Sequence, residues 1–275
     1  MDSNRFILNF APTGIVPTKE LNPYTPITLK EIVSEAIEAY NLGASIVHLH
    51  ARDAQGKPTR DPEVYKRLIG GIRKVCPDYI VCVSLSSRIA DNFSRLAPLE
   101  LGPEKPDMAS LTVGSVSLPT GPSINSLTSI MSICDRLNDL EIKPEIEAFE
   151  PGMLEFCNYL IKKRKLKAPL YCNIFVGARG ASGLSTANLA AFEHAAPPDT
   201  FICLAGLGRY QLRAHAVGLT LYDGVRVGLE DSPFEEYTPE KLPARNSVLI
   251  ERVLNLAQTL KRKPISAKEF RNILL

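Results

Sequence analysis

Apolar residues recur along the chain in short, nearly continuous runs that predict β-strands. In Tyr79-Ile80-Val81-Cys82-Val83 both alternating sets of positions are apolar, which is typical of strands covered on both faces. Eight such runs occur, at residues 6–11, 45–50, 79–84, 108–113, 145–149, 170–176, 200–204 and 224–229. Stretches with helical periodicity separate them, so the pattern predicts parallel βα units and, with eight strands, an α/β fold of the (β/α)8 TIM-barrel type.

Helix start and stop signals support this alternation of strands and helices. Thr28-Leu29-Lys30-Glu31 predicts a capping box before an amphipathic segment at 32–40, and Gly43 follows as a stop. Ser266 and Glu269 repeat the capping device before a last helix. The segment 246–261 predicts a long helix after the eighth strand.

Length and composition describe an ordinary folded protein. A chain of 275 residues suits one large domain or two small ones, and barrels of this type commonly use about 250 residues as one domain. Hydrophobic residues make up 45% and charged residues 23%, which is close to the globular average and gives enough apolar residues for a core. We expect a single barrel domain over residues 1–275.

Charge and cysteine usage narrow the partners and the compartment. The 32 basic and 30 acidic residues are spread along the chain, without the concentrated basic face that nucleic-acid binding needs. Six cysteines are scattered without a C-x-x-C pair, which fits a reducing compartment. The first apolar run is too short for a signal peptide, and no run approaches the roughly 20 apolar residues of a membrane span. We predict a cytoplasmic protein with neither a nucleic-acid nor a membrane partner.

The strongest chemical signal is the sequence His48-Leu49-His50 at the end of the second predicted strand. Strand alternation places both imidazoles on one face, inside the barrel. Neutral imidazole is a good zinc ligand, and two histidines plus a carboxylate leave a coordination position for substrate. On its own the pair is equally consistent with two histidines that hydrogen-bond in a polar barrel mouth.

The eighth predicted strand supplies the missing carboxylate. Alternation in the segment 225–231 predicts that Arg226, Gly228 and Glu230 share the inner face. An internal ion pair would explain this strand by itself. In a closed barrel, however, only one strand separates the second strand from the eighth, so Glu230 can meet both histidines. Asp231 lies just past the strand, where a base oriented and kept ionised by Arg226 fits, although a turn or helix-cap role is the plainer reading.

Other inward-facing polar residues are candidates for substrate contact. Glu145 and Glu147 share a face, and two carboxylates there are costly without a cation, ligand or hydrogen-bond donors. Ser84 and Ser110 offer hydroxyls to a substrate carboxylate, although small polar residues also occur at barrel mouths for packing. Thr13 and Val16 lie in the long loop after the first strand, on the face where catalytic loops gather.

Missing motifs exclude several chemistries. The sequence has no P-loop, no G-x-G-x-x-G and no G-x-S-x-G elbow, so nucleotide hydrolysis, dinucleotide redox chemistry and serine hydrolysis lack their usual support. Gly206 and Gly208 follow the seventh predicted strand, where barrel loops often bind phosphate, such as that of a coenzyme. Glycine there serves a tight βα turn equally well.

Four segments together resemble the β-keto acid cleavage enzyme family, which includes the 3-keto-5-aminohexanoate cleavage enzyme. They are Thr18-Lys-Glu-Leu-Asn-Pro23, Gly43-Ala-Ser-Ile-Val-His-Leu-His-Ala-Arg-Asp53, Lys143-Pro-Glu-Ile-Glu147 and Arg226-Val-Gly-Leu-Glu-Asp231. The resemblance runs over nearly the whole chain. It implies a zinc-bound barrel, usually a homotetramer, in which a β-keto acid reacts with acetyl-CoA to give acetoacetate and a new acyl-CoA.

The resemblance also implies roles for individual residues. It assigns the zinc (Zn2+) ligands to His48, His50 and Glu230. It makes Asp231, together with Arg226, the pair that removes the proton. Ser84 and the strand that carries Glu145 and Glu147 are then near the substrate. Zinc would polarise the β-keto carbonyl while Asp231 moves the proton.

One departure from the family pattern bears on the substrate. The amino-substituted relative carries a glutamate where this chain has Val16, and glycines where it has Ser86 and Ser87. A buried substrate ammonium without its carboxylate partner would cost several kcal/mol. We therefore expect a substrate without the 5-amino group, with an apolar or neutral side chain.

Two other classes of function stay open at this point. One is a metal-dependent barrel hydrolase or class II aldolase that uses the same ligands without CoA. The other is a binding protein for a metal or small acid that has kept the barrel without catalysis.

Overall fold

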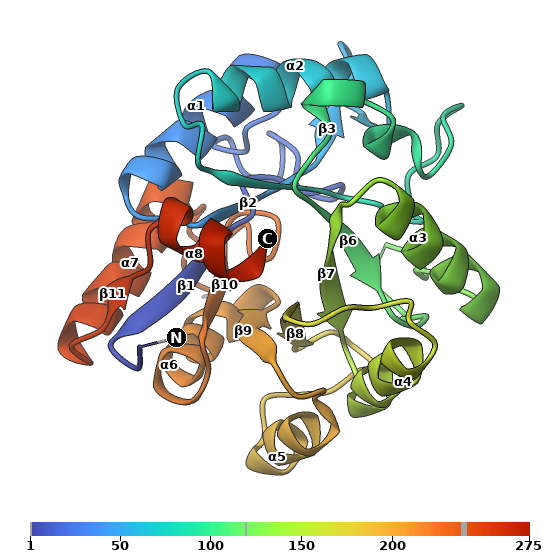
Figure 1. Ribbon diagram of the computed structural model, residues 1–275. Helices are drawn as coiled ribbons and strands as arrows, with labels where there is room; N and C mark the ends of the chain where they lie inside the picture. Colours follow the sequence, from blue (N-terminus) through green and yellow to red (C-terminus); the bar gives the residue numbers. More distant parts are fainter. Residues whose placement is uncertain (1, 119, 238–240) are drawn as a thin grey trace.

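Eight parallel strands form a closed barrel in the computed structural model, which describes residues 2–118, 120–237 and 241–275 (Figure 1). The strands are β1 (Arg5–Phe10), β2 (Ile46–Leu49), β5 (Ile80–Val83), β6 (Met108–Thr112), β7 (Lys143–Ala148), β8 (Leu170–Val176), β9 (Thr200–Gly206) and β10 (Gly224–Val227). Each pairs with its neighbour in chain order, and β10 pairs with β1 to close the ring. The predicted TIM barrel is confirmed.

Helices surround the ring and alternate with the strands, as predicted. They are α1 (Leu29–Asn41), α2 (Pro62–Arg73), α3 (Leu127–Asp139), α4 (Pro151–Lys162), α5 (Thr186–Ala195), α6 (Gln211–Leu221), α7 (Asn246–Thr259) and α8 (Ala267–Leu274). Both predicted capping boxes are present, Thr28 with Glu31 at α1 and Ser266 with Glu269 at α8. Side chains such as Val47, Val225 and Val227 point outward into the apolar layer beneath these helices.

The last helix closes one end of the barrel. The short strand β11 (Lys263–Pro264) pairs with the start of β1 and leads the chain into α8, which lies across the middle of the ring in Figure 1. Phe270 of α8 is fully buried and packs edge-on against Tyr171 and Phe201. This end holds the amino ends of the strands, so the opposite end is left for function.

The eighth barrel strand is shorter than predicted. The segment 224–229 was expected to be strand, but β10 ends at Val227. Gly228 has a φ of 149° and passes so close to β1 that a Cβ would lie 2.0 Å from the carbonyl oxygen of Ala11. A turn follows, in which the amides of Asp231 and Ser232 donate to the Gly228 carbonyl. Glu230 therefore reaches the barrel mouth on a turn, and strand alternation was the wrong reason for its position.

A second departure lies between β2 and α2. There β3 (Ala51–Arg52) and β4 (Pro58–Thr59) form a small antiparallel pair outside the barrel.

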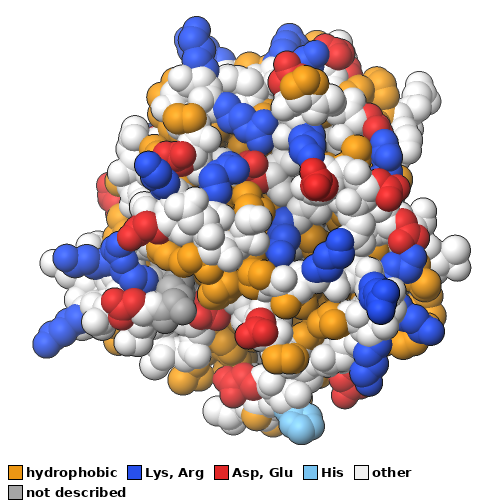
Figure 2. Space-filling view, viewed as in Figure 1, with side chains coloured by type: hydrophobic (Ala, Val, Ile, Leu, Met, Phe, Trp, Pro, Cys, Tyr) orange, Lys and Arg blue, Asp and Glu red, His pale blue; other side chains and the backbone are white. Residues whose placement is uncertain are grey.

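The surface carries charges of both signs, and the cysteines lie inside the protein. Figure 2 shows Lys and Arg side chains spread over the α8 face, with Asp, Glu and apolar side chains between them. All six cysteines are buried and unbonded. Within the described ranges, no helix combines the length and apolar character that crossing a membrane requires.

Candidate active site

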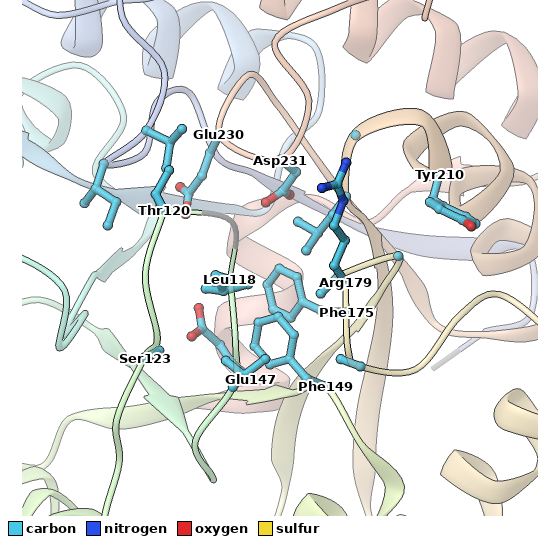
Figure 3. A pocket seen from close by; sticks show the side chains of 18 of the residues that line it. Leu118, Thr120, Ser123, Glu147, Phe149, Phe175, Arg179, Tyr210, Glu230 and Asp231 are labelled. Carbon is cyan, nitrogen blue, oxygen red and sulfur yellow. The ribbon is translucent and has the colours of Figure 1, made fainter.

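A cavity of about 740 Å³ lies at the carboxyl ends of the barrel strands (Figure 3). Its lining includes six of the titratable or hydroxyl groups singled out in the sequence: His50, Ser84, Glu147, Arg226, Glu230 and Asp231. Figure 3 shows Glu230 and Asp231 on one side of the cavity and Glu147, Phe149 and Phe175 on another. The position is the one where TIM-barrel enzymes carry out their chemistry.

His48 is held by a carboxylate behind it. Its Nδ1 lies 2.5 Å from Oε2 of Glu145, and both side chains are buried. Burial lowers the pKa of His48, but the negative charge of Glu145 outweighs this and leaves the pKa raised. A proton on Nδ1 that is donated to Glu145 leaves Nε2 as the free lone-pair atom, and Nε2 has no hydrogen-bond partner among the described residues.

Glu230 meets both histidines. Its Oε1 lies 3.2 Å from Nε2 of His50 and 3.9 Å from Nε2 of His48. Burial alone would raise the pKa of Glu230, but Arg226 and the two imidazoles overcome it and lower the pKa. Gly14 makes room for this side chain, since a Cβ there would lie 2.5 Å from Cγ of Glu230.

The three side chains fit a divalent metal. Ligand atoms bound tetrahedrally to zinc at about 2.0–2.1 Å lie about 3.4 Å apart, close to the two separations seen here. Nε2 of His48 and Oε2 of Glu230 are buried without partners among the described residues, as unfilled ligands would be. A second grouping, His48 with Cys82 and Glu145, fits less well: burial holds the pKa of Cys82 well above its usual value, which keeps the thiol protonated.

Arg226 and Asp231 form a two-point ion pair beside this cluster. Nε of Arg226 lies 2.9 Å from Oδ2 of Asp231, and Nη2 donates to Oδ1 at 3.2 Å. Nη2 also lies 2.8 Å from Glu230 Oε1. Burial raises the pKa of Asp231, and the charge of Arg226 only partly opposes this. The pair therefore presents a fixed carboxylate that is a stronger proton acceptor than an exposed aspartate.

A hydrogen-bond network under the cavity fixes Glu145. Asn9 and Asn173 each donate from Nδ2 to its Oε1, at 2.7 and 2.9 Å. The hydroxyl of Tyr171 accepts from Asn9 and donates to Asn173. Burial raises the pKa of Glu145, but His48, Arg226 and Asn9 together lower it to about 2. Sequence reasoning missed these partners, although Asn9 and Asn173, inside apolar strands, were a visible signal.

The remaining candidates separate into two groups. Ser84, Glu147 and Val16 line the cavity, with Val16 41% exposed and Glu147 accepting a 2.6 Å bond from Thr112. Glu145, Ser110 and Thr13 do not line it. Glu145 is turned toward His48, and Ser110 accepts from the amide of Leu85. Thr13 is fully buried.

Two aromatic rings and a cation in the cavity wall were not singled out in the sequence. Phe149 and Phe175 stack with ring centroids 4.7 Å apart, and the guanidinium of Arg226 lies 5.1 Å from the Phe175 ring. Arg88, in the loop after β5, also lines the cavity. No spacing in the sequence connects these side chains, because they come from separate loops and strands.

Fold and cavity together define a (β/α)8-barrel enzyme whose titratable groups gather at the carboxyl ends of its strands. The model of the beta-keto acid cleavage enzyme family matches residues 5–275, and the chain belongs to that family. The family expected from the four sequence segments is thus confirmed.

Curated relatives cover almost the whole chain. A 3-keto-5-aminohexanoate cleavage enzyme of Fusobacterium nucleatum is 34% identical over 272 residues, which is 98% of this chain and 97% of that protein. A 3-oxoadipate:acetyl-CoA acetyltransferase of Cupriavidus necator is 32% identical over 98% of this chain and 94% of that protein.

The fold is also found among solved structures. A binary complex of ObcA with oxaloacetate has a TM-score of 0.76 at 20% identity, with 92% of this chain and 67% of that chain covered. At this identity the likeness concerns the fold alone.

Proposed function

We propose that this protein is a zinc-dependent enzyme that cleaves a β-keto acid with acetyl-CoA, giving acetoacetate and a new acyl-CoA. The observation that carries the proposal is the cluster of His48, His50 and Glu230, with unpartnered ligand atoms, beside the Arg226–Asp231 ion pair. Relatives named as acetyl-CoA transferases support the co-substrate.

The proposed chemistry divides among these groups. Bound zinc would supply a Lewis acid next to the β-keto oxygen. Asp231 accepts a proton from the carbon between the keto group and the carboxylate of the acid, and Arg226 holds Asp231 in one orientation. Glu145 acts as a positioning residue that fixes the ring of His48. Ser84 and Glu147 line the cavity and face the substrate, whereas Ser110 and Thr13 support its wall.

The substrate in this proposal lacks a 5-amino group. Val16 lines the cavity. The family resemblance implies that the carboxylate partner of a substrate ammonium stands at this position in the amino-substituted relative. The enzyme further acts as a cytoplasmic homotetramer in this proposal, as the family resemblance implies. The six buried, unbonded cysteines agree with the compartment, and sedimentation of the purified protein tests the tetramer.

A panel of β-keto acids tests the reaction. The zinc-loaded protein is incubated with each acid and acetyl-CoA, and acetoacetate and new acyl-CoA are followed by mass spectrometry. We expect product from at least one acid. His48→Ala should abolish it and remove bound zinc, because one ligand of three is lost. His194→Ala, an exposed histidine on α5, is the matched control and should change neither.

The same assay separates the other two classes of function. Cleavage of an acid without acetyl-CoA would point to a hydrolase or class II aldolase. Bound zinc with no turnover across a broad panel would leave a binding protein.

A further inference from the structure

Arg88 is a half-buried cation of the cavity wall, and one of its guanidinium nitrogens has a hydrogen-bond partner among the described residues. It lies in the loop after β5, four residues beyond Ser84. Its Nη1 donates to Oγ1 of Thr120 at 2.8 Å, and within the described residues its side chain forms no ion pair. A guanidinium offers five N–H donors in a planar fork, so the cavity side of Arg88 is free to bind an acceptor.

Three arginines of nearby loops bind other groups of the protein, unlike Arg88. Arg179 and Arg209 also line the cavity, but both are exposed, whereas Arg88 is half-buried. Arg60 pairs with Asp91 at 2.9 Å, and Arg95 donates to the Leu85 carbonyl and to Asn125. Arg52 donates to the backbone carbonyls of the loop after β1. Those three cations hold loops together, and none lines the cavity. In the part of the chain that the structure describes, the guanidinium of Arg88 has one partner, the hydroxyl of Thr120.

The electrostatics of the cavity favour an anion at Arg88. Burial lowers the pKa of Arg88, and the negative charges of Glu230 and Glu147 only partly offset this. Arg226, a fully buried cation of the cavity wall, is already paired with Asp231 and Glu230. A carboxylate from the substrate would restore the stabilisation that Arg88 loses on leaving water, in the two-point geometry that suits a guanidinium.

The loop after β5 carries Arg88 farther from the strand end than Ser84. Ser84 directly follows β5, at the level of the proposed metal centre, so it can serve the carboxylate next to the keto group. Arg88 is farther along the same loop and is tied to Thr120, in the loop between β6 and α3. In Figure 3, Thr120 lies on the same side of the cavity as Glu230, and Arg179 lies on the opposite side.

We propose that Arg88 binds a second carboxylate, at the far end of the substrate, so that the enzyme prefers dicarboxylic β-keto acids. This inference rests on the proposed function and specifies its substrate class. It revises the neutral side chain expected from Val16. A glutamate at that position would repel an anionic substrate, whereas a valine carries no charge and leaves recognition of the anion to Arg88.

Two acids of equal length give the test. 3-Oxoadipate and 3-oxohexanoate differ only in the terminal carboxylate, and kcat/KM is measured for each with acetyl-CoA. We expect the wild-type protein to favour 3-oxoadipate at least tenfold, an estimate of about 1.4 kcal/mol or more. Arg88→Gln should lower kcat/KM for 3-oxoadipate about 30-fold and change that for 3-oxohexanoate less than about threefold. Arg88→Lys should fall between.

Arg179→Gln removes the same charge from the same cavity. Arg179 is exposed and lies opposite Thr120, so this variant should leave the ratio of the two acids unchanged. An equal loss for both acids in Arg88→Gln would overturn the inference, because Arg88 would then bind the carboxylate common to both. A rise confined to the KM of acetyl-CoA would overturn it as well, by assigning Arg88 to the coenzyme.

Binding without turnover keeps the inference separate from the proposed function. Calorimetry of adipate against hexanoate, with zinc-loaded wild-type protein and no acetyl-CoA, should show tighter binding of adipate. No product from either keto acid would overturn the proposed function, while the adipate preference would still support Arg88. Equal binding of both acids would overturn the role of Arg88 even if Arg88→Gln does not fold.

Discussion

The two ends of the barrel interior are built from the same strands and differ in almost every physical respect. At the amino ends, Ile7, Ile46 and Ile80 form an apolar floor that α8 covers. His48 is the next inward-facing residue after Ile46 on β2, and Glu230 lies just beyond the end of β10. Alternation decides that a side chain points inward, and its distance along the strand decides whether it meets the floor or the cavity.

Tyr171 connects the two ends of the barrel interior. Tyr171 packs its ring against Phe270 of the floor and bonds through its hydroxyl to Asn9 and Asn173, which hold Glu145. An amphipathic side chain can serve both environments at once. The apolar floor therefore stabilises the barrel, whereas the buried charges at the cavity end lower its stability.

Asp231→Asn should have the largest effect on turnover among changes that keep the proposed metal ligands. Asparagine retains the shape and a hydrogen bond to Arg226 but cannot accept the proton, so kcat should fall about 10²–10⁴-fold. Zinc content, measured by plasma mass spectrometry, should stay at the wild-type level. Asp139→Asn on the surface of α3 is the control, and an unchanged kcat in Asp231→Asn would remove the residue from catalysis.

Glu145→Gln should have an intermediate effect, through the metal. Loss of the carboxylate behind His48 should weaken zinc affinity about 10–100-fold, as changes behind metal-bound histidines do. Competition with a chelator measures the affinity, and excess zinc should restore most of the activity. Glu147→Gln changes the same charge on the same strand without touching His48, so an equal loss of zinc affinity there would contradict this role for Glu145.

Phe270→Ala should have the smallest effect on turnover and a large one on stability. Truncation of this buried ring should lower the free energy of unfolding by about 3–5 kcal/mol. Chemical denaturation measures this, and kcat of the folded variant should stay near wild type. Phe93→Ala, at a ring 41% exposed, should cost much less. A strong fall in kcat with an unchanged free energy of unfolding would contradict this prediction, because the floor would then contribute to turnover and not to stability.

The sequence predicted the barrel well because its signals are local. Continuous apolar runs and capping boxes need no tertiary information, and the eight strands and both boxes lie where expected. The end of β10 was missed because it depends on the close approach of Gly228 to Ala11, a contact between residues far apart in the chain.

The candidate site was predictable where residues share a strand. His48 with His50, and Arg226 with the acidic residues after it, were visible as patterns. The sequence did not predict which of Glu145 and Glu147 faces the cavity. Both point inward, and only the hydrogen bonds from Asn9 and Asn173 to Glu145 distinguish them. Arg88 escaped notice because its significance is the absence of an ion pair among the described residues, which no motif records.

Closure of the ring between β10 and β1 has a consequence for biosynthesis. The two histidines leave the ribosome early and Glu230 late, and they meet only after the last barrel strand has paired with the first. A nascent chain that ends before Glu230 carries two histidines but not the third group of the cluster. Zinc uptake would then report completed closure of the barrel, and metal bound only by the closed form would protect the finished enzyme from reopening.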